Sequence, residues 1–286
     1  MSLSLGRLRA GGTPKQPSDP EGRMTLVEHL RELRSRLIKA VAAIVIGMVL
    51  GWIFYDALFE LLRKPLESAI ANLAKERQID AKLVFDDVAG PLMLQLKVAL
   101  IAGIVVSSPV WLYQIWSFIL PGLHRNERKW TMVFMGTAAP LFIGGVVMGY
   151  FALPKGLNVL IDFTPLGVSN YQSVSIYLSF TLRLLLIFGV AFEIPIFVVL
   201  LNLVGVLSAA RLGKIRSWLI FGIFVFAAVA TPSTDPVTML LLALPMTALF
   251  LVSELIARFI ERRRRARLIA QGIDIDEIEN AGKVDD

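Results

Sequence analysis

The sequence predicts an all-α, polytopic membrane protein with six transmembrane helices, and three observations lead to this fold class. The 286 residues are 56% hydrophobic and 18% charged, with a mean hydropathy of +0.67, whereas soluble domains of this size are less apolar. The apolar residues form long blocks, and a membrane helix needs about 20 of them in a row. The positive charges stand mostly between these blocks.

Composition also excludes several kinds of site. The chain has no cysteine and only two histidines, which excludes disulfides, thiolate zinc sites, iron–sulfur clusters, cysteine nucleophiles and a histidine-rich metal site. The sequence contains no HExxH, GxSxG or GxxxxGK[ST] motif. We therefore expect neither an enzyme nor a bound cofactor. The net charge of +6 lies in the flanks of apolar blocks, which favours anionic membrane lipids as partners and not nucleic acid.

The first 37 residues divide into two parts. Residues 1–24 are rich in Gly, Pro, Ser and Arg and contain no apolar run, which predicts a flexible extension and not a signal peptide. The next segment predicts an amphipathic helix, because Thr25 and Glu28 have capping-box spacing and the leucines from Leu26 to Leu37 form one stripe. We expect this helix to lie along the membrane surface and then turn into the first span. Glu32 has the spacing of an ordinary i,i+4 pair with Arg36.

The six predicted spans cover residues 37–58, 92–120, 132–153, 176–206, 218–230 and 237–256. Pro109 should kink the second span, because proline removes a helical hydrogen bond and clashes with the preceding turn. Glycines in GxxxG spacing indicate close helix contacts. They occur at Gly47 and Gly51 in the first span, and at Gly145 and Gly149 in the third.

The segments between the spans complete the domain, which is expected to cover residues 25–260. Residues 59–89 are predicted to form short helices in an external loop, residues 154–175 a second external loop, and residues 207–217 a polar turn. The fifth span has 13 residues, about 20 Å against a hydrocarbon core of about 30 Å. We therefore expect short fifth and sixth spans, a thinned bilayer beside them and a concave, glove-like bundle. Residues 261–286 are expected to form a basic and then acidic tail.

Charge sets the orientation. An even number of spans places both termini on one side of the membrane. With Lys39 at the start of the first span included, that side carries 21 of the 29 lysines and arginines, against 6 on the other side. Cytoplasmic segments carry the excess of positive charge in membrane proteins. We therefore expect a multi-pass protein of the cytoplasmic membrane with both termini in the cytoplasm.

Glu193 is the residue that the membrane environment explains least. It lies near the middle of the fourth span, where a carboxylate costs roughly 2.5–3.5 kcal/mol. Arg183 is ten residues away, about 15 Å along a helix, which is too far for an ion pair. Glu193 should therefore face protein, a partner helix or water. A satisfied interhelical hydrogen bond would explain it, and so would a functional role such as that of a proton-coupled secondary transporter.

Four stretches of the chain resemble the TatC subunit of the twin-arginine translocase. They are HLRELRSRL (29–37), SSPVWLYQIWSFILPGLHRNERK (107–129), FGVAFEIP (188–195), and TPSTDP (231–236) together with LLALPM (241–246). Any one of them would be a weak signal, but the four occur in the order that the family has them. The resemblance covers about residues 25–260.

This resemblance implies a receptor in the cytoplasmic membrane for folded proteins whose signal peptides carry consecutive arginines. It also implies single-span partners of the TatA and TatB type, assembly with further copies of the chain, and transport driven by the proton-motive force. Carried over by position, the residues that bind the signal peptide would be Glu32 and Glu127, assisted by Leu33, Arg34 and Phe118.

The resemblance assigns further positions outside this group. Glu193 takes the place of the family's intramembrane carboxylate, which contacts a partner span or the inserted signal peptide. Many relatives have a glutamine where this chain has Met239, so Thr238 is the nearest polar substitute. Pro65 and Asp235 match positions in the family's external loops.

Carboxylates suit an arginine-pair ligand, because guanidinium binds them through two parallel hydrogen bonds that lysine cannot reproduce. Exposed ion pairs contribute only about 0–1 kcal/mol each, whereas micromolar binding needs about 8 kcal/mol. The apolar part of a signal peptide must therefore contribute most of the binding, by lying in a groove on the spans.

Overall fold

The computed structural model of the chain describes residues 26–77, 81–85, 88–119, 128–162, 170–203, 205, 207–231 and 236–271. The helices of this part are α1 (Leu26–Ile53), α2 (Tyr55–Arg77), α3 (Gly90–Val106), α4 (Ser108–Ile119), α5 (Arg128–Asp162), α6 (Val174–Ala191), α7 (Ile194–Leu203), α8 (Ala209–Ala230) and α9 (Pro236–Ala270). Two short strands, β1 (Ala81–Val84) and β2 (Asn170–Ser173), pair in parallel. The predicted all-α class therefore holds for nearly the whole described chain.

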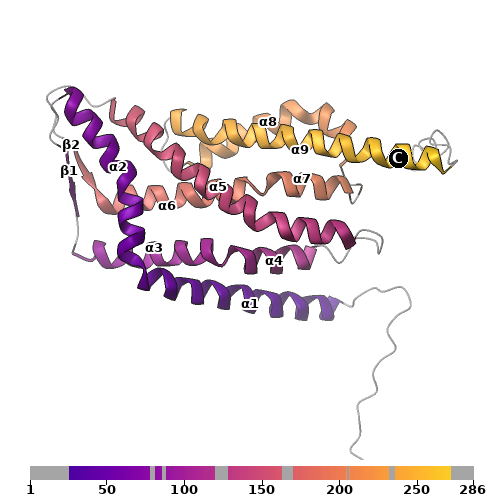
Figure 1. The fold of residues 1–286 in the computed structure, drawn as a ribbon, viewed down its shortest axis with the longest axis horizontal. Coiled ribbons are helices and arrows are strands. Elements are labelled where there is room, and N and C mark those ends of the chain that lie inside the picture. Colours follow the sequence, from indigo (N-terminus) through magenta and orange to yellow (C-terminus); the bar gives the residue numbers. More distant parts are fainter. Residues whose placement is uncertain are drawn as a thin grey trace, which may run out of the picture.

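The long helices run side by side, and the two ends of the bundle differ (Figure 1). α1, the α3–α4 pair, the α6–α7 pair and α9 lie along the long axis, α5 crosses them obliquely, and α2 stands across one end beside the strands. The N-terminal end of α1 and the C-terminal end of α9 both lie at the opposite end, on opposite sides of the bundle. We call this the α9 end of the bundle.

Five helical segments of the described chain are long and apolar enough to cross a membrane, and six are counted if the bent α3–α4 pair forms one span. The α6–α7 pair counts as one of the five. Many large apolar side chains on these helices are exposed, including Val41, Val45 and Val49 on α1. An apolar surface of this extent fits contact with lipid tails and not with water.

Helix α1 differs from the prediction at its start. The amphipathic segment and the first span form one continuous helix, Leu26–Ile53, so the expected turn into the membrane is wrong. Residues 26–53 contain no proline, and their interior glycines, Gly47 and Gly51, face α3. The polar face of the first three turns therefore projects directly from the span and lies against α4.

The kink predicted at Pro109 is confirmed. α3 and α4 meet at Ser107 with a bend of 58°. The helical ladder of α3 ends where Ser107 N donates to the Gly103 carbonyl at 3.0 Å. The next carbonyl, that of Ile104, accepts from the Trp111 indole N–H at 2.8 Å, so the bend leaves this acceptor bonded.

Helices extend further than predicted in three regions. In place of the short helices expected in residues 59–89, one helix, α2, runs to Arg77 and passes through Pro65. α5 continues through Pro154 to Asp162. The polar turn at 207–217 is wrong from Ala209 onward, because Ser208 caps α8 by accepting from Arg211 N at 3.2 Å. α8 thus has 22 residues and α9 has 35, so the helices that contain the predicted fifth and sixth spans are not short. The concave shape stays a prediction.

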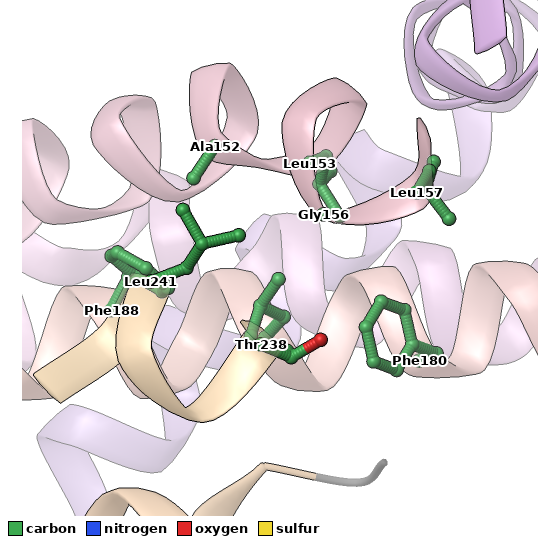
Figure 2. Close-up of a pocket in the computed structure, with 9 residues that line it drawn as sticks. Ala152, Leu153, Gly156, Leu157, Phe180, Phe188, Thr238 and Leu241 are labelled. Carbon is green, nitrogen blue, oxygen red and sulfur yellow. The ribbon is translucent and has the colours of Figure 1, made fainter. Parts of the chain in front are cut away.

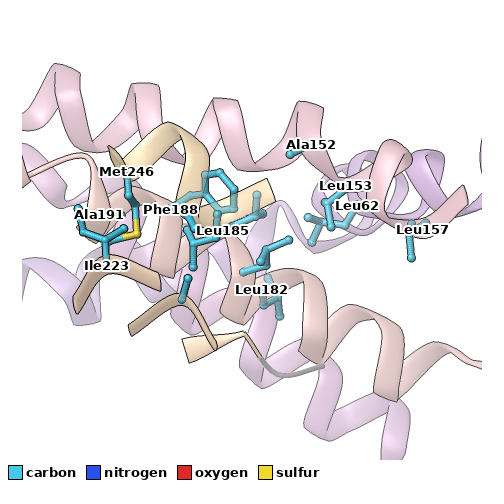
Figure 3. Close-up of a cluster of buried hydrophobic side chains, with 14 of the residues drawn as sticks. Leu62, Ala152, Leu153, Leu157, Leu182, Leu185, Phe188, Ala191, Ile223 and Met246 are labelled. Atoms are coloured by element: carbon cyan, nitrogen blue, oxygen red, sulfur yellow. The ribbon is translucent and has the colours of Figure 1, made fainter. Parts of the chain in front are cut away.

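Glycines place helices in close contact, as the GxxxG spacings predicted. A Cβ at Gly47 would lie 2.7 Å from the Gly103 carbonyl oxygen of α3, and a Cβ at Gly145 would lie 2.5 Å from the Phe188 carbonyl oxygen of α6. Phe188 is fully buried and belongs to the main apolar core, which also contains residues of α2, α5, α6, α8 and α9 (Figure 3). The core therefore joins the oblique helix α5 to α2 and α6 and to the α8–α9 pair.

Charged side chains also join α8 to α9. Glu254 of α9 is only 3% exposed, and its carboxylate accepts from Arg216 Nε at 3.0 Å and Nη2 at 2.8 Å. Arg258, one turn further along α9, donates to the same carboxylate at 2.5 Å. We call these three residues the Glu254 cluster. Two arginines thus bind one buried carboxylate, which is the condition under which a buried charge is tolerated.

Gly103→Ala should destabilise the protein. The new Cβ would lie 2.5 Å from the Met48 backbone nitrogen and 2.9 Å from the Ile44 carbonyl oxygen, and these atoms cannot move without separating α1 from α3. Overpacking of this kind costs about 1–3 kcal/mol, more than the roughly 1 kcal/mol that alanine gains in helix propensity. Thermal unfolding in detergent should show a lower Tm. Gly136→Ala is the control, because its Cβ would meet nothing within 4 Å; an equal fall in Tm in both variants would contradict the packing argument.

The Glu254 cluster predicts an asymmetry between its members. Arg216 and Arg258 are 43% and 42% exposed, so each reaches water without Glu254, whereas the carboxylate does not reach water without them. The Arg216→Met, Arg258→Met double variant should therefore have a lower Tm than Glu254→Met, and adding Glu254→Met to the double variant should restore Tm. The same unfolding assay compares them. A triple variant less stable than the double variant would refute this account.

Candidate functional site

A polar groove lies between α1 and α4 at the α9 end of the bundle. It has a volume of about 740 Å³. The side chains that line it come from successive turns of one face of α1 and from the facing turns of α4. They are Glu28, Arg31, Glu32, Ser35, Arg36 and Lys39 of α1, and Tyr113, Gln114 and Ser117 of α4.

Glu32 and Arg36 form the polar contact that joins the two walls of the groove. Glu32 Oε1 accepts from Arg36 Nε at 2.9 Å and Nη2 at 2.5 Å, and Arg36 Nη1 donates to Ser117 Oγ. The i,i+4 pair expected from the sequence therefore exists, and it also reaches across to α4. Glu32 Oε2 is buried and has no hydrogen-bond partner among the described residues. One carboxylate oxygen is thus held by Arg36, and the other can accept from a ligand.

The other predicted site residues of this region are only partly brought together. The Phe118 ring stacks on His29 of α1, with 4.5 Å between ring centroids and 19° between planes, so it lies at the same α1–α4 contact as Glu32. Leu33 is 41% exposed and Arg34 is also exposed; neither lines the groove. Glu127 lies outside the described residues.

Sequence reasoning missed the roles of Arg36 and Ser117 in this groove. Arg36 was weighed only as a surface partner of Glu32, because nothing in the sequence shows which face of α1 meets α4. The available signal was the polar spacing 28, 31–32, 35–36 and 39 on α1, which places one polar stripe along a continuous helix. That stripe becomes informative once the helix is known to continue into the span.

Glu193 lies at the break between α6 and α7. Pro195 has no N–H to continue the ladder, and the chain makes two turn residues there, Phe192 and Glu193. Glu193 is 5% exposed, so it faces protein, as expected. Its carboxylate interacts with the indole of Trp116 on α4, but neither carboxylate oxygen has a partner in hydrogen-bond geometry within the described chain. A buried carboxyl in this state is costly and is available to a further donor.

Thr238 is buried in a different place. It is 2% exposed and lines a small cavity between α5, α6 and α9, whose other walls are apolar, among them Leu153, Phe180 and Leu241 (Figure 2). The cavity measures about 10 Å³, about the minimum for one water molecule. Glu193 does not line it, so the structure does not bring these two predicted residues into one pocket.

Pro65 has a structural consequence in α2. It is buried inside the helix and cannot donate to the Leu61 carbonyl four residues earlier. The Tyr150 hydroxyl of α5 donates to that carbonyl at 3.0 Å, and the Tyr177 hydroxyl of α6 donates to the neighbouring Leu62 carbonyl at 3.1 Å. The proline thus exposes acceptors that fix α2 to two spans. Asp235 lies outside the described residues.

Comparisons with known proteins agree on one family. The family model described as Sec-independent protein translocase protein (TatC) matches residues 28–245. The Sec-independent protein translocase protein TatC of Xylanimonas cellulosilytica is 42% identical over 245 residues, covering 86% of this chain and 87% of that protein. The protein of the same name from Frankia casuarinae is 44% identical over 254 residues, covering 86% of this chain and 69% of that one.

A solved structure supports the same assignment. The crystal structure of a twin-arginine translocase receptor, TatC, in the detergent DDM superposes with a TM-score of 0.69. It is 34% identical in sequence, and the match covers 80% of this chain and 99% of that one. The chain therefore belongs to the TatC family of Sec-independent protein translocase subunits.

Proposed function

We propose that this chain is the receptor subunit that binds twin-arginine signal peptides at the cytoplasmic face of the membrane. The observation that carries the proposal is the α1–α4 groove, which is lined by Glu32, a residue with one carboxylate oxygen that has no hydrogen-bond partner among the described residues. The groove lies at the α9 end of the bundle, which holds the positively charged segments of the chain and is therefore the cytoplasmic end. Both termini are then cytoplasmic.

A pair of arginines is the ligand that best suits the groove. A guanidinium can donate to Glu32 Oε2 while Arg36 keeps Oε1, because a carboxylate accepts from several donors at once. Arg36 is itself bonded to Ser117 and holds the Glu32 carboxylate in place, so little side-chain freedom is lost on binding. Glu127, which follows α4 in sequence, is proposed as the second carboxylate, with Leu33, Arg34 and Phe118 in contact with the peptide.

Electrostatics alone gives this groove little affinity for a cationic peptide. Its lining has two glutamates and three basic residues, so its own charge is +1. The apolar segment of the signal peptide must supply most of the binding, along exposed apolar side chains such as Leu30, Leu37 and Val41 on α1. The arginines then select the peptide, and the apolar segment retains it.

The remaining parts of the proposal concern the working complex. Partners of the TatA and TatB type would contact the buried Glu193 or the Thr238 region through their spans, and several copies of the chain would assemble. Energy would come from the proton-motive force. The second candidate function, a proton-coupled secondary transporter, rests on the same residue, because a buried carboxyl without a hydrogen-bond partner is suited to exchange a proton.

Glu32→Gln should weaken the binding of a twin-arginine signal peptide. Hydrogen bonds to charged groups contribute about 1.5–3 kcal/mol, so we expect about a tenfold or greater rise in Kd. Fluorescence anisotropy of a labelled peptide, titrated with the purified protein in nanodiscs, measures this. Glu60→Gln is the matched control, because Glu60 forms an exposed i,i+4 pair with Lys64 in α2. An unchanged Kd in Glu32→Gln, or an equal change in both variants, would reject the site.

Glu193 variants separate partner binding from proton exchange. Glu193→Leu should keep or raise the Tm of the isolated subunit, because it removes a buried carboxyl without a hydrogen-bond partner, yet it should reduce co-purification with a TatB-type partner. Glu193→Gln should retain the partner and much of the export activity, since an amide still donates and accepts. A Gln variant that binds the partner normally but exports nothing would favour proton coupling. Signal-peptide affinity should stay unchanged in both variants.

A further inference from the structure

A basic cleft between α8 and α9 is not used by the proposed function. It has a volume of about 370 Å³, within the range of small-molecule sites. The side chains that line it belong to the first turns of α8 and to the part of α9 beyond the predicted sixth span. They are Ala209, Ala210 and Gly213 of α8, and Arg258, Glu261, Arg262 and Arg265 of α9.

The cleft follows from the sequence pattern of the two helices. The four charged residues of α9 stand at positions i, i+3, i+4 and i+7, which places them on one face of the helix. This face meets two alanines and a glycine at the start of α8, and residues with a small side chain or none leave space beside a helix. The guanidinium groups can therefore approach a ligand held against α8.

Three of the four charges of the cleft, Glu261, Arg258 and Arg265, have contacts within the protein. Glu261 Oε1 accepts from Ala209 N at 2.7 Å and from Asn202 Nδ2 at 2.8 Å, so it already caps the start of α8. Arg258 donates to the buried Glu254. The lining has three arginines and one glutamate, a net charge of +2, which favours an anion. Arg262 and Arg265 are the arginines beyond Arg258 on this face.

The position of the cleft indicates the kind of anion. Trp218 and Phe221 of α8 are 76% and 61% exposed, and Leu255 and Phe259 of α9 are 65% and 53% exposed. Trp218 and Phe221 follow the cleft residues along α8, and Leu255 and Phe259 stand before the last three cleft residues of α9, so these apolar side chains lie on the side of the cleft toward the middle of the bundle. The cleft thus lies where an exposed apolar surface gives way to charge, which is the level of lipid headgroups in a membrane.

We propose that this cleft binds the phosphate of an anionic phospholipid, with Arg262 and Arg265 as the principal donors. Guanidinium groups bind phosphate through paired hydrogen bonds, and a net charge of +2 favours a lipid with net negative charge over a zwitterionic one. The acyl chains would lie along the exposed apolar side chains of α8 and α9. The lipid would join these two helices beside the Glu254 cluster.

Native mass spectrometry of the full chain, released from detergent with added lipid, tests the proposal. Phosphatidylglycerol is titrated against phosphatidylcholine for the parent, for the Arg262→Gln, Arg265→Gln variant, and for the Arg263→Gln, Arg267→Gln control. The control also loses two positive charges from α9, but its residues do not line the cleft. Arg263 lies over the Phe259 ring, with 4.3 Å between its guanidinium carbon and the ring centroid. The cleft variant should bind phosphatidylglycerol about tenfold or more weakly, and the control should change by less than about twofold.

Several outcomes would overturn the proposal. Equal losses in the two variants would show a general charge effect, and equal binding of phosphatidylcholine by the parent would show no preference for anionic lipid. Full displacement of phosphatidylglycerol by millimolar inorganic phosphate would make this a site for free anions and not for lipid. If the cleft variant does not fold, Arg262→Lys with Arg265→Lys keeps the charge and removes the forks; it should show an intermediate loss, and unchanged binding would contradict the assigned donors.

Discussion

The structure depends on one constraint: a backbone carbonyl that loses its helical partner in a water-poor environment must receive a hydrogen bond from elsewhere in the protein. A helix bend and a proline each create such a carbonyl in this fold. At the α3–α4 bend the Ile104 carbonyl is bonded by Trp111, and before Pro65 the Leu61 carbonyl is bonded by Tyr150. Each replacement donor, Trp111 or Tyr150, is an aromatic side chain that carries one polar group. The bends of the fold are therefore fixed by specific bonds and are not flexible points.

This constraint also positions the candidate site. The 58° bend between α3 and α4 redirects α4, which packs on α1 as α3 does, so that Ser117 reaches Arg36. Close contact at Gly47 and Gly103 holds the other half of the same helix pair together. The groove is thus an outcome of two features at different heights: a glycine contact that joins the helices, and a proline bend that sets the path of the second helix beyond it.

The sequence predicted the spans and their special residues better than it predicted where helices end. The class of fold follows from the long apolar blocks, and the kink at Pro109, the glycine contacts and the burial of Glu193 follow from single residues with a local physical effect. The helix boundaries at Pro154 and Ala209 do not, because a proline or a polar residue is tolerated in a helix when neighbours supply bonds and packing. The continuity of α1 was missed for the same reason: amphipathic and apolar patterns were taken for two elements although no helix-breaking residue separates them.

At the site, the pairing of Glu32 with Arg36 was predictable from spacing, but its extension to Ser117 required the relative placement of two helices. The Glu254 cluster shows a similar limit. Glu254 and Arg258 are neighbours in sequence and form a recognisable i,i+4 pair, whereas Arg216 is 38 residues away. Nothing local indicates that two arginines converge on one carboxylate. Long-range polar contacts are set by packing, which pattern reasoning along one chain does not determine.

The two buried carboxylates of the spans, Glu254 and Glu193, therefore differ in what they contribute to the fold. Glu254 accepts three hydrogen bonds of 2.5–3.0 Å from Arg216 and Arg258, so its charge is satisfied inside the chain and stabilises the α8–α9 pair. Glu193 is equally buried, but within the described part of the chain its oxygens lack such bonds, and the Trp116 indole is the group that interacts with it. A carboxyl that contributes nothing comparable to the fold is destabilising where it stands. We propose that its presence at the α6–α7 break serves a donor that arrives with another molecule, and this is the physical reason to seek a partner contact at Glu193.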